Sequence, residues 1–185
     1  MEIAIKQVTS WSRALDAARW TVHKDSLEDK EPSDKFKKQI LLAEHSPIRE
    51  VVYDITIKGI PQWVSVHFVR HHEGVQFYVG TQREDRVKLN CKRGELPQGS
   101  LVDVKITANA QALINISRKR LCSKAASETR SVWKAVITEL SFVDPIMASK
   151  CVPECVYRGF CPEIQSCRWC DTHSYRELVN NYREV

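Results

Sequence analysis

The chain has 185 residues, 43% of them hydrophobic and 28% charged, with a formal net charge of +5. This composition suits one domain with a packed core and excludes a chain that is disordered throughout. No apolar run approaches the roughly 18–20 residues of a membrane span, and the N-terminus does not resemble a secretory signal. We therefore expect a cytoplasmic protein without a membrane partner. Lys and Arg form no dense block, so a nucleic-acid-binding arm is not predicted.

Hydrophobic periodicity and capping residues predict the elements of the first third of the chain. In chain order they are a strand at 3–8, a helix at 14–20, a polar loop at 23–32, a helix at 33–42 capped by Ser33, and a strand at 51–57 ended by Gly59 and Pro61. The segment 63–71 fits both periods: its apolar residues alternate as in a strand, and they also line one face of a helix.

The rest of the chain predicts one more strand and several helices. They are a strand at 102–106, a helix at 110–124, a helix at 127–142 broken by Asp144-Pro145, and a terminal helix at 174–184. Strands and helices do not alternate regularly, so the fold class is α+β. The sequence contains neither G-x-G-x-x-G nor G-x-x-x-x-G-K-[ST], which argues against a Rossmann or P-loop nucleotide site.

Two clusters of polar residues are candidates for chemistry. The first, residues 70–83, places arginines, histidines and a Gly-Thr pair within fourteen positions, a composition suited to phosphate. The plainer interpretation is a charged surface turn. The second is the predicted helix from Asn109 to Leu121, on which Asn109 and Arg120 share a face while Asn115 points elsewhere. Such a helix would offer polar groups in two directions, unless these residues simply face water.

These clusters carry a resemblance to a known family. Arg70-His71, followed by Thr81 and Arg83, is similar to the R-H-R-x-x-S-x-N-x-x-S-x-R signature of the flavin-dependent thymidylate synthases. Asn109-Ala110-Gln111-Ala112-Leu113-Ile114-Asn115 and Arg120-Leu121 resemble that family's N-A-R-S-L-x-N-x-x-x-x-R-L, and Glu44-His45-Ser46-Pro47-Ile48 resembles its H-x-T-P-F. The resemblance covers a domain at residues 1–145 and implies a mixed sheet with packed helices in a homotetramer.

The family converts dUMP to dTMP with FAD, NADPH and methylenetetrahydrofolate, so the resemblance implies a flavoprotein methyltransferase of nucleotide biosynthesis. It makes Arg120 the catalytic residue that activates the base. The residues implied for dUMP are His67, Arg70, Gly80, Thr81, Gln82, Arg83, Arg93 and Arg120. Those implied for FAD are Ser46, Arg70, His71, His72, Asn109, Gln111 and Asn115. The alternatives are transfer of a related one-carbon group, such as hydroxymethyl, and a non-catalytic flavin- or nucleotide-binding protein.

The sequence departs from the family pattern at several positions on the flavin or folate side of the site. His72 replaces the second arginine of R-H-R, Arg49 replaces a glutamate, and Thr81 and Arg83 come one residue later than in the signature. The arginines implied to hold the nucleotide are better preserved. The resemblance therefore implies pyrimidine nucleotide binding more firmly than the complete methylation reaction.

Five of the seven cysteines crowd into a tail, residues 146–185, that we expect to pack on the main domain. Their spacing in a reducing compartment suggests metal binding rather than disulfides. Zinc held by Cys161, Cys167, Cys170 and His173 is one hypothesis, and an iron–sulfur cluster is a second. The plainer alternative is a set of small buried residues. The family resemblance does not supply this feature.

Overall fold

The computed structural model describes residues 1–89 and 91–185 and contains a four-stranded sheet. The strands are β1 (Glu2–Gln7), β2 (Val52–Pro61), β3 (Val75–Val79) and β4 (Leu101–Asn109), in the order β1-β2-β4-β3. All three pairings are antiparallel. The predicted α+β class is confirmed. The family resemblance implied a mixed sheet, whereas the sheet in the structure is antiparallel.

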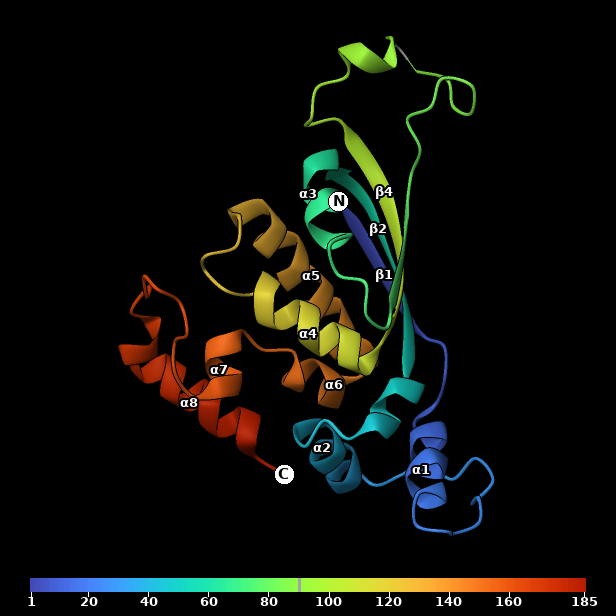
Figure 1. Ribbon diagram of the computed structural model, residues 1–185, viewed down its shortest axis with the longest axis vertical. Coiled ribbons are helices and arrows are strands. Elements are labelled where there is room, and N and C mark those ends of the chain that lie inside the picture. Colours follow the sequence, from blue (N-terminus) through green and yellow to red (C-terminus); the bar gives the residue numbers. More distant parts are fainter. Residues whose placement is uncertain (90) are drawn as a thin grey trace.

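One face of the sheet is buried beneath helices. Tyr53, Ile55 and Ile57 of β2 alternate with more exposed residues, and Val104 and Ile106 of β4 do the same. This period of two is that of strands with one face on a core. Helices α3 (Gln62–Phe68), α4 (Ala110–Arg120) and α5 (Ser127–Val143) supply the other side of that core (Figure 1).

The remaining helices surround this layer. They are α1 (Trp11–Trp20), α2 (Asp34–Leu42), α6 (Pro145–Lys150), α7 (Glu154–Arg158) and α8 (His173–Arg183), with short 3-10 turns η1 (Ser46–Glu50), η2 (Arg93–Glu95) and η3 (Trp169–Asp171). The cap predicted at Ser33 is confirmed: its side chain accepts a hydrogen bond from the Phe36 N–H at 3.3 Å. Among the described residues, no helix is both long and apolar enough to cross a membrane.

Several boundaries differ from the sequence predictions. Strand β2 does not end at Gly59 but continues to Pro61, because the register shifts between Ile57 and Ile60 and Gly59 takes a positive φ of 71° there. A bulge of this kind bends a strand without ending it. Segment 63–71 is helical only as far as Phe68. Helix α4 ends at Arg120, four residues before the predicted end, and β3, α6 and α7 were not predicted at all.

The C-terminal segment contributes to two cores. Met147, Ala148 and Cys151 belong to the main core, so packing continues past the boundary predicted at residue 145. A smaller cluster follows, formed by Val152, Val156, Tyr175, Val179 and Tyr182. The helices α7 and α8 thus have an apolar cluster of their own.

Asp144 joins three parts of the main core. One carboxylate oxygen accepts hydrogen bonds from the Trp11 indole and from the Tyr53 hydroxyl, both at 2.7 Å. The other accepts from the Met147 N–H at 2.9 Å and caps α6. Asp144 is 6% exposed, so a buried charge is stabilised by three donors from different elements. Burial and this carboxylate raise the pKa of Tyr53 far above its usual value.

We predict that Asp144→Ala lowers the free energy of unfolding by about 3 kcal/mol, because it leaves two buried donors unsatisfied and removes a helix cap. Urea denaturation measures the change. Asp85, whose side chain is 57% exposed, provides the matched control, and Asp85→Ala should alter stability by less than about 0.5 kcal/mol. Equal losses in the two variants would contradict the role given to Asp144.

Candidate functional site

Strand β4 passes directly into α4 at Asn109. The backbone N–H of Asn109 donates to the Gly74 carbonyl at 3.0 Å, and the next N–H, of Ala110, donates to the Val51 carbonyl at 2.8 Å. The Asn109 side chain accepts from the Ala112 N–H at 2.9 Å and caps the helix. Since no loop intervenes, the central strand fixes the position of the helix that carries most of the predicted site.

Gly74 lies against this cap. Its φ is +68°, and a Cβ added there would stand 2.6 Å from the Asn109 side-chain amide. A glycine is required both by the backbone conformation and by this close approach. Gly74 therefore lets the segment carrying residues 70–73 lie beside the start of α4.

A polar cavity of about 550 Å³ opens at this junction. It is lined by Glu44, Arg49, Glu73, Gly74, Asn109, Gln111 and Asn115. The sequence interpretation that Asn115 points away from Asn109 is wrong. Asn109 is the cap residue in extended backbone, with φ −81° and ψ 165°, so its direction does not follow the helical period. All three predicted polar side chains of this helix motif line one cavity.

An ion pair that sequence reasoning missed organises the cavity wall. Glu44 pairs with Arg118, and its second oxygen accepts from the Gln111 side chain at 2.6 Å. The Arg118 guanidinium also stacks on the Tyr157 ring, 3.4 Å from its centroid. Glu44 has a positive φ of 51°, which is uncommon for a glutamate. In the sequence, the only indication that Glu44 has a role was its place in the Glu44–Ile48 motif. That motif does not indicate which residue Glu44 would pair with.

A smaller cavity of about 130 Å³ adjoins the first. It is lined by Arg70, His71, His72, Glu73, Ala112, Asn115 and Ile116, and the two cavities share Glu73 and Asn115. Both predicted histidines and Arg70 thus face the same region as Asn109 and Gln111. The structure brings together six of the seven residues that the resemblance implies for FAD.

Arg120 lies beside this smaller cavity and is held from two sides. Its Nε donates to His71 Nε2 at 3.0 Å, and its Nη2 donates to the His67 backbone carbonyl. His71 Nε2 must therefore be an acceptor, which places the proton of the neutral ring on Nδ1. Burial, and next the charge of Arg120, lower the pKa of His71 to about 4. Arg120 is therefore a cation that donates a hydrogen bond to the neutral imidazole of His71.

Two predicted residues lie away from these cavities. The His67 ring forms a 2.7 Å hydrogen bond with the buried Thr129 hydroxyl and packs edge-on against Trp63, so only its backbone carbonyl is directed to Arg120. Ser46 lines a separate hollow of about 660 Å³ between α1 and α2. Within one chain, neither side chain joins the group around Asn109.

The residues implied for the nucleotide phosphate also lie apart. Thr81 accepts from the Arg83 N–H at 3.2 Å, Arg83 pairs with Asp85, and Glu84 accepts from the Arg93 N–H. Residues 80–89 and 91–100 project beyond the sheet (Figure 1). Thr81 lies seven positions after Gly74, and an extended strand rises about 3.3 Å per residue, a span of roughly 23 Å. One chain does not unite Gly80, Thr81, Gln82, Arg83 and Arg93 with Arg120.

The proposed zinc ligands are not assembled as the sequence suggested. His173 is exposed and its ring is turned toward Glu177, 3.5 Å away. In the described ranges, 1–89 and 91–185, no group of three or more His, Cys, Asp or Glu side chains is placed to hold a metal ion. All seven cysteines are free thiols.

The fold is that of the flavin-dependent thymidylate synthases. The enzyme of this kind from Helicobacter pylori, complexed with FAD and dUMP, aligns with a TM-score of 0.66 and 17% identity over 82% of this chain and 100% of that one. The UMP/dUMP methylase PolB from Streptomyces cacaoi, bound with 5-bromo-dUMP, aligns with a TM-score of 0.63 and 14% identity over 86% of this chain and 96% of that one.

The sequence comparison agrees with the structural one. Residues 81–146 match the family described as thymidylate synthase complementing protein, a span that includes the helix motif from Asn109 to Leu121. No curated protein sequence matches the chain. The resemblance indicated by the motifs is therefore confirmed.

We predict that Gly74→Ala lowers the free energy of unfolding by about 2–3 kcal/mol, because alanine is strained at this φ and its methyl group displaces the Asn109 cap. Urea denaturation checks this value. Gly94→Ala is the control, since a Cβ at Gly94 meets no atom within 4 Å. A Gly74→Ala variant as stable as the control would show that the close approach is not needed.

We also predict that stability falls as the pH is lowered from about 6.5 to 4. An unfolded histidine titrates near 6.5, so in this window the unfolded chain binds a proton that the folded His71 does not. His71→Gln keeps a neutral acceptor for Arg120 and should flatten this part of the profile. His23→Asn, at an exposed position, should leave it unchanged; the measurement is thermal unfolding across the pH range.

Proposed function

We propose that the chain is a flavin-dependent enzyme that adds a one-carbon group to a uracil nucleotide, with methylation of dUMP to dTMP as the favoured reaction. One comparison structure holds FAD with dUMP, and another holds 5-bromo-dUMP, on the same fold. The observation that carries the proposal is the fixed position of Arg120 beside the cavity formed by residues 70–73 and α4. We assign Arg120 the catalytic role.

Arg120 is suited to stabilise negative charge on a pyrimidine ring. Its Nε and Nη2 are engaged by His71 and by the backbone of α3, and in the described part of the chain Nη1 makes no protein hydrogen bond. The remaining N–H groups are thus oriented before a ligand arrives. A preorganised cation at the position where charge develops lowers the activation free energy by several kcal/mol in well-studied enzymes.

The cavity residues fit the binding of FAD. Arg70 and Arg49 are cations suited to a diphosphate, while Asn109, Gln111 and Asn115 offer amide groups to a flavin ring or a ribose. Glu44 is neutralised by Arg118 and therefore does not repel an anionic cofactor. Hydride transfer is the chemistry that FAD supplies when bound, with NADPH as the reductant and methylenetetrahydrofolate as the one-carbon donor in the proposed reaction.

The separation of the two groups of residues supports a shared site. Residues 80–83 and Arg93 extend away from Arg120 of their own chain, and their arginine side chains are exposed. We propose that this loop, like His67 and Ser46, contributes to dUMP or FAD binding between subunits of a homotetramer. A nucleotide would then receive its phosphate contacts from one copy and Arg120 from another.

Two alternatives concern the chemistry itself. His72 in place of an arginine and Arg49 in place of a glutamate alter the cavity in which hydride delivery and water exclusion would be controlled. These changes are the reason for two alternatives: another one-carbon product, such as hydroxymethyl, and a non-catalytic flavin- or nucleotide-binding protein. Product analysis by mass spectrometry distinguishes another one-carbon product from the methylated one. A turnover assay distinguishes a non-catalytic binding protein from an enzyme.

The first experiment is the visible absorption spectrum of the FAD-loaded protein with and without dUMP. A flavin band that shifts on addition of dUMP is the expected result, because adjacent binding changes the environment of the ring. No flavin binding after addition of FAD would contradict the proposal. A flavin band that does not respond to dUMP, UMP or their 5-bromo derivatives would contradict the proposal that a uracil nucleotide binds beside the flavin.

We predict that Arg120→Lys lowers turnover of dUMP at least a hundredfold while the protein stays folded. A lysine presents one point charge and cannot bond His71 and the His67 carbonyl while also facing a ligand. Arg13→Lys, at a side chain 63% exposed and paired with Glu50, is the matched control and should keep full activity. Turnover by Arg120→Lys equal to that of the control would contradict the catalytic role assigned to Arg120.

A further inference from the structure

Three side-chain amides line the cavity of about 550 Å³: those of Asn109, Gln111 and Asn115. An amide has an oxygen that only accepts hydrogen bonds and an NH2 group that only donates them. The protein partner on one side of each amide therefore determines which group faces the other side. The partners of these three amides indicate which kind of ligand the cavity can bind.

The Gln111 amide turns its NH2 group toward the protein. Its Nε2 donates to Glu44 Oε2 at 2.6 Å and to Asn115 Oδ1 at 3.3 Å. A carboxylate only accepts, so the reverse orientation would place the amide oxygen against another acceptor. Because both N–H groups are used by the protein, Gln111 Oε1 is left as a hydrogen-bond acceptor for a ligand.

The amides of Asn109 and Asn115 have the opposite orientation. Asn115 Oδ1 accepts from Gln111 Nε2 and from Nη1 of Arg118, 3.4 Å away, and a guanidinium only donates. Asn109 Oδ1 accepts from the Ala112 N–H at the start of α4. The NH2 groups of both asparagines are therefore left as donors.

The three remaining polar atoms are open to a ligand. In the described part of the chain, Asn109 Nδ2, Gln111 Oε1 and Asn115 Nδ2 form no hydrogen bond with the protein. None of them is a buried atom without a partner, a condition that among the described residues belongs to Arg118 Nε. The cavity thus presents two donors and one acceptor, and the complementary ligand edge has two acceptors and one donor.

The ion pair between Glu44 and Arg118 fixes this pattern. The carboxylate directs the NH2 group of Gln111, and the guanidinium directs the oxygen of Asn115. The two charged side chains are only 17% and 11% exposed, respectively. Water and salt screen a largely buried pair much less than a surface pair, so its charges hold the amides in one orientation.

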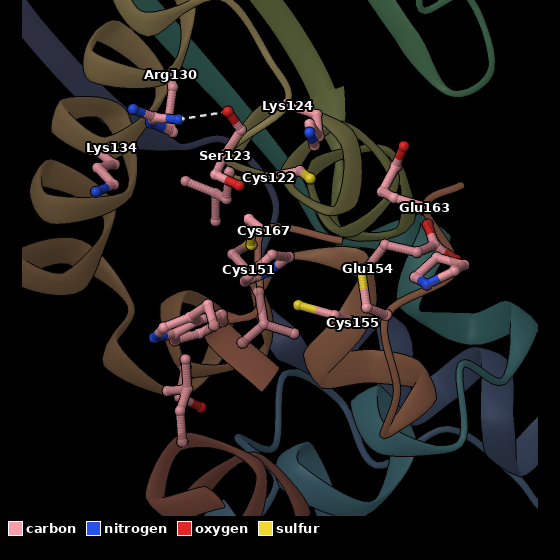
Figure 2. A pocket seen from close by; sticks show the side chains of 18 of the residues that line it. Cys122, Ser123, Lys124, Arg130, Lys134, Cys151, Glu154, Cys155, Glu163 and Cys167 are labelled. Atoms are coloured by element: carbon pink, nitrogen blue, oxygen red, sulfur yellow. Dashed lines mark hydrogen bonds between the residues drawn. The ribbon is translucent and has the colours of Figure 1, made fainter. Parts of the chain in front are cut away.

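Helix α7 of the C-terminal segment supports the ion pair. The Tyr157 ring lies against the Arg118 guanidinium, with 3.4 Å between Cζ and the ring centroid. A separate cavity of about 510 Å³ also borders α7, and Cys122 and Cys155 line it (Figure 2), whereas Tyr157 does not. Tyr157 is therefore placed to hold Arg118 and is not part of that second cavity.

We propose that Glu44 and Arg118 are positioning residues, which orient the three amides to bind the imide edge of a ring, –CO–NH–CO–. An imide has one donor between two acceptors and so complements the two donors and one acceptor of the cavity. Both the flavin ring and uracil have this edge. The inference rests on the proposed function, because FAD and a uracil nucleotide are the ligands proposed for this region.

The test compares FAD with its analogue methylated at flavin N3, and dUMP with 3-methyl-dUMP, in calorimetric titrations of the full chain. Methylation removes the imide N–H, so one of the two methylated ligands should bind at least about tenfold more weakly than its parent. A loss with the flavin analogue identifies the flavin ring as the bound imide, and a loss with the nucleotide identifies uracil.

The outcomes separate this inference from the proposed function. Methylated ligands that both bind as well as their parents overturn the inference and leave flavin binding intact. Absence of FAD binding by the unaltered protein contradicts the proposed function, and the titrations with dUMP and 3-methyl-dUMP then decide the inference.

Variants distinguish positioning from a general loss of structure. Glu44→Gln keeps an acceptor for Arg118 but no longer dictates the orientation of Gln111, and Gln111→Met removes the acceptor. In both variants the parent-to-methylated affinity ratio should fall to about threefold or less, whereas a structural fault would weaken both ligands and keep the ratio. Glu50→Gln, the same exchange at a surface pair with Arg13, should retain the ratio. An unchanged ratio in Glu44→Gln or Gln111→Met overturns the inference.

The contribution of α7 is tested at Tyr157. Tyr157→Leu removes the ring against which Arg118 stacks and should lower the affinity ratio, whereas Tyr157→Phe keeps the ring and should retain it. Far-UV circular dichroism checks that both variants fold. Equal ratios in the two variants would contradict the support that we assign to Tyr157.

Discussion

The candidate site depends on the direct passage of strand β4 into helix α4. Asn109 is both the last residue of the strand and the cap of the helix, so an element held in the middle of the sheet sets the direction of Gln111, Asn115 and Arg120. Gly74 brings the neighbouring segment against the same cap. Because β4 passes into α4 without an intervening loop, the polar side chains of α4 are placed by the core and not by a flexible loop.

Charge at the site is arranged by pairing some groups and leaving others available. Glu44 and Arg118 neutralise each other in the cavity wall, and His71 is kept neutral by burial and by Arg120. Burial, and then the charge of Arg70, lower the pKa of Arg120, but a guanidinium remains protonated near neutral pH. The cavity region therefore keeps cationic groups for an anionic ligand while its wall carries little net charge.

Part of this arrangement could be predicted from the sequence. The alternation over residues 51–57 and 102–106 and the cap at Ser33 gave the main elements, because burial on one face and capping leave local patterns. That residues 70–73 lie near Asn109 was implied by the family resemblance and not by any local pattern. The Glu44–Arg118 pair and the position of Cys122 and Cys155 on one cavity could not be predicted, since each joins residues more than thirty positions apart without a shared period. Asn115 was misplaced because helical periodicity does not apply to a cap residue.

The projecting loop between β3 and β4 has a consequence for genetics. In the proposed assembly its arginines act on a nucleotide held by the α4 helix of another copy, so a single active centre draws on two polypeptides. Two inactive alleles, one damaged in the loop and one in the helix, would then complement each other when expressed together, because mixed assemblies contain some centres built from two intact halves. Interallelic complementation of this kind is the behaviour that the geometry of one chain leads us to expect.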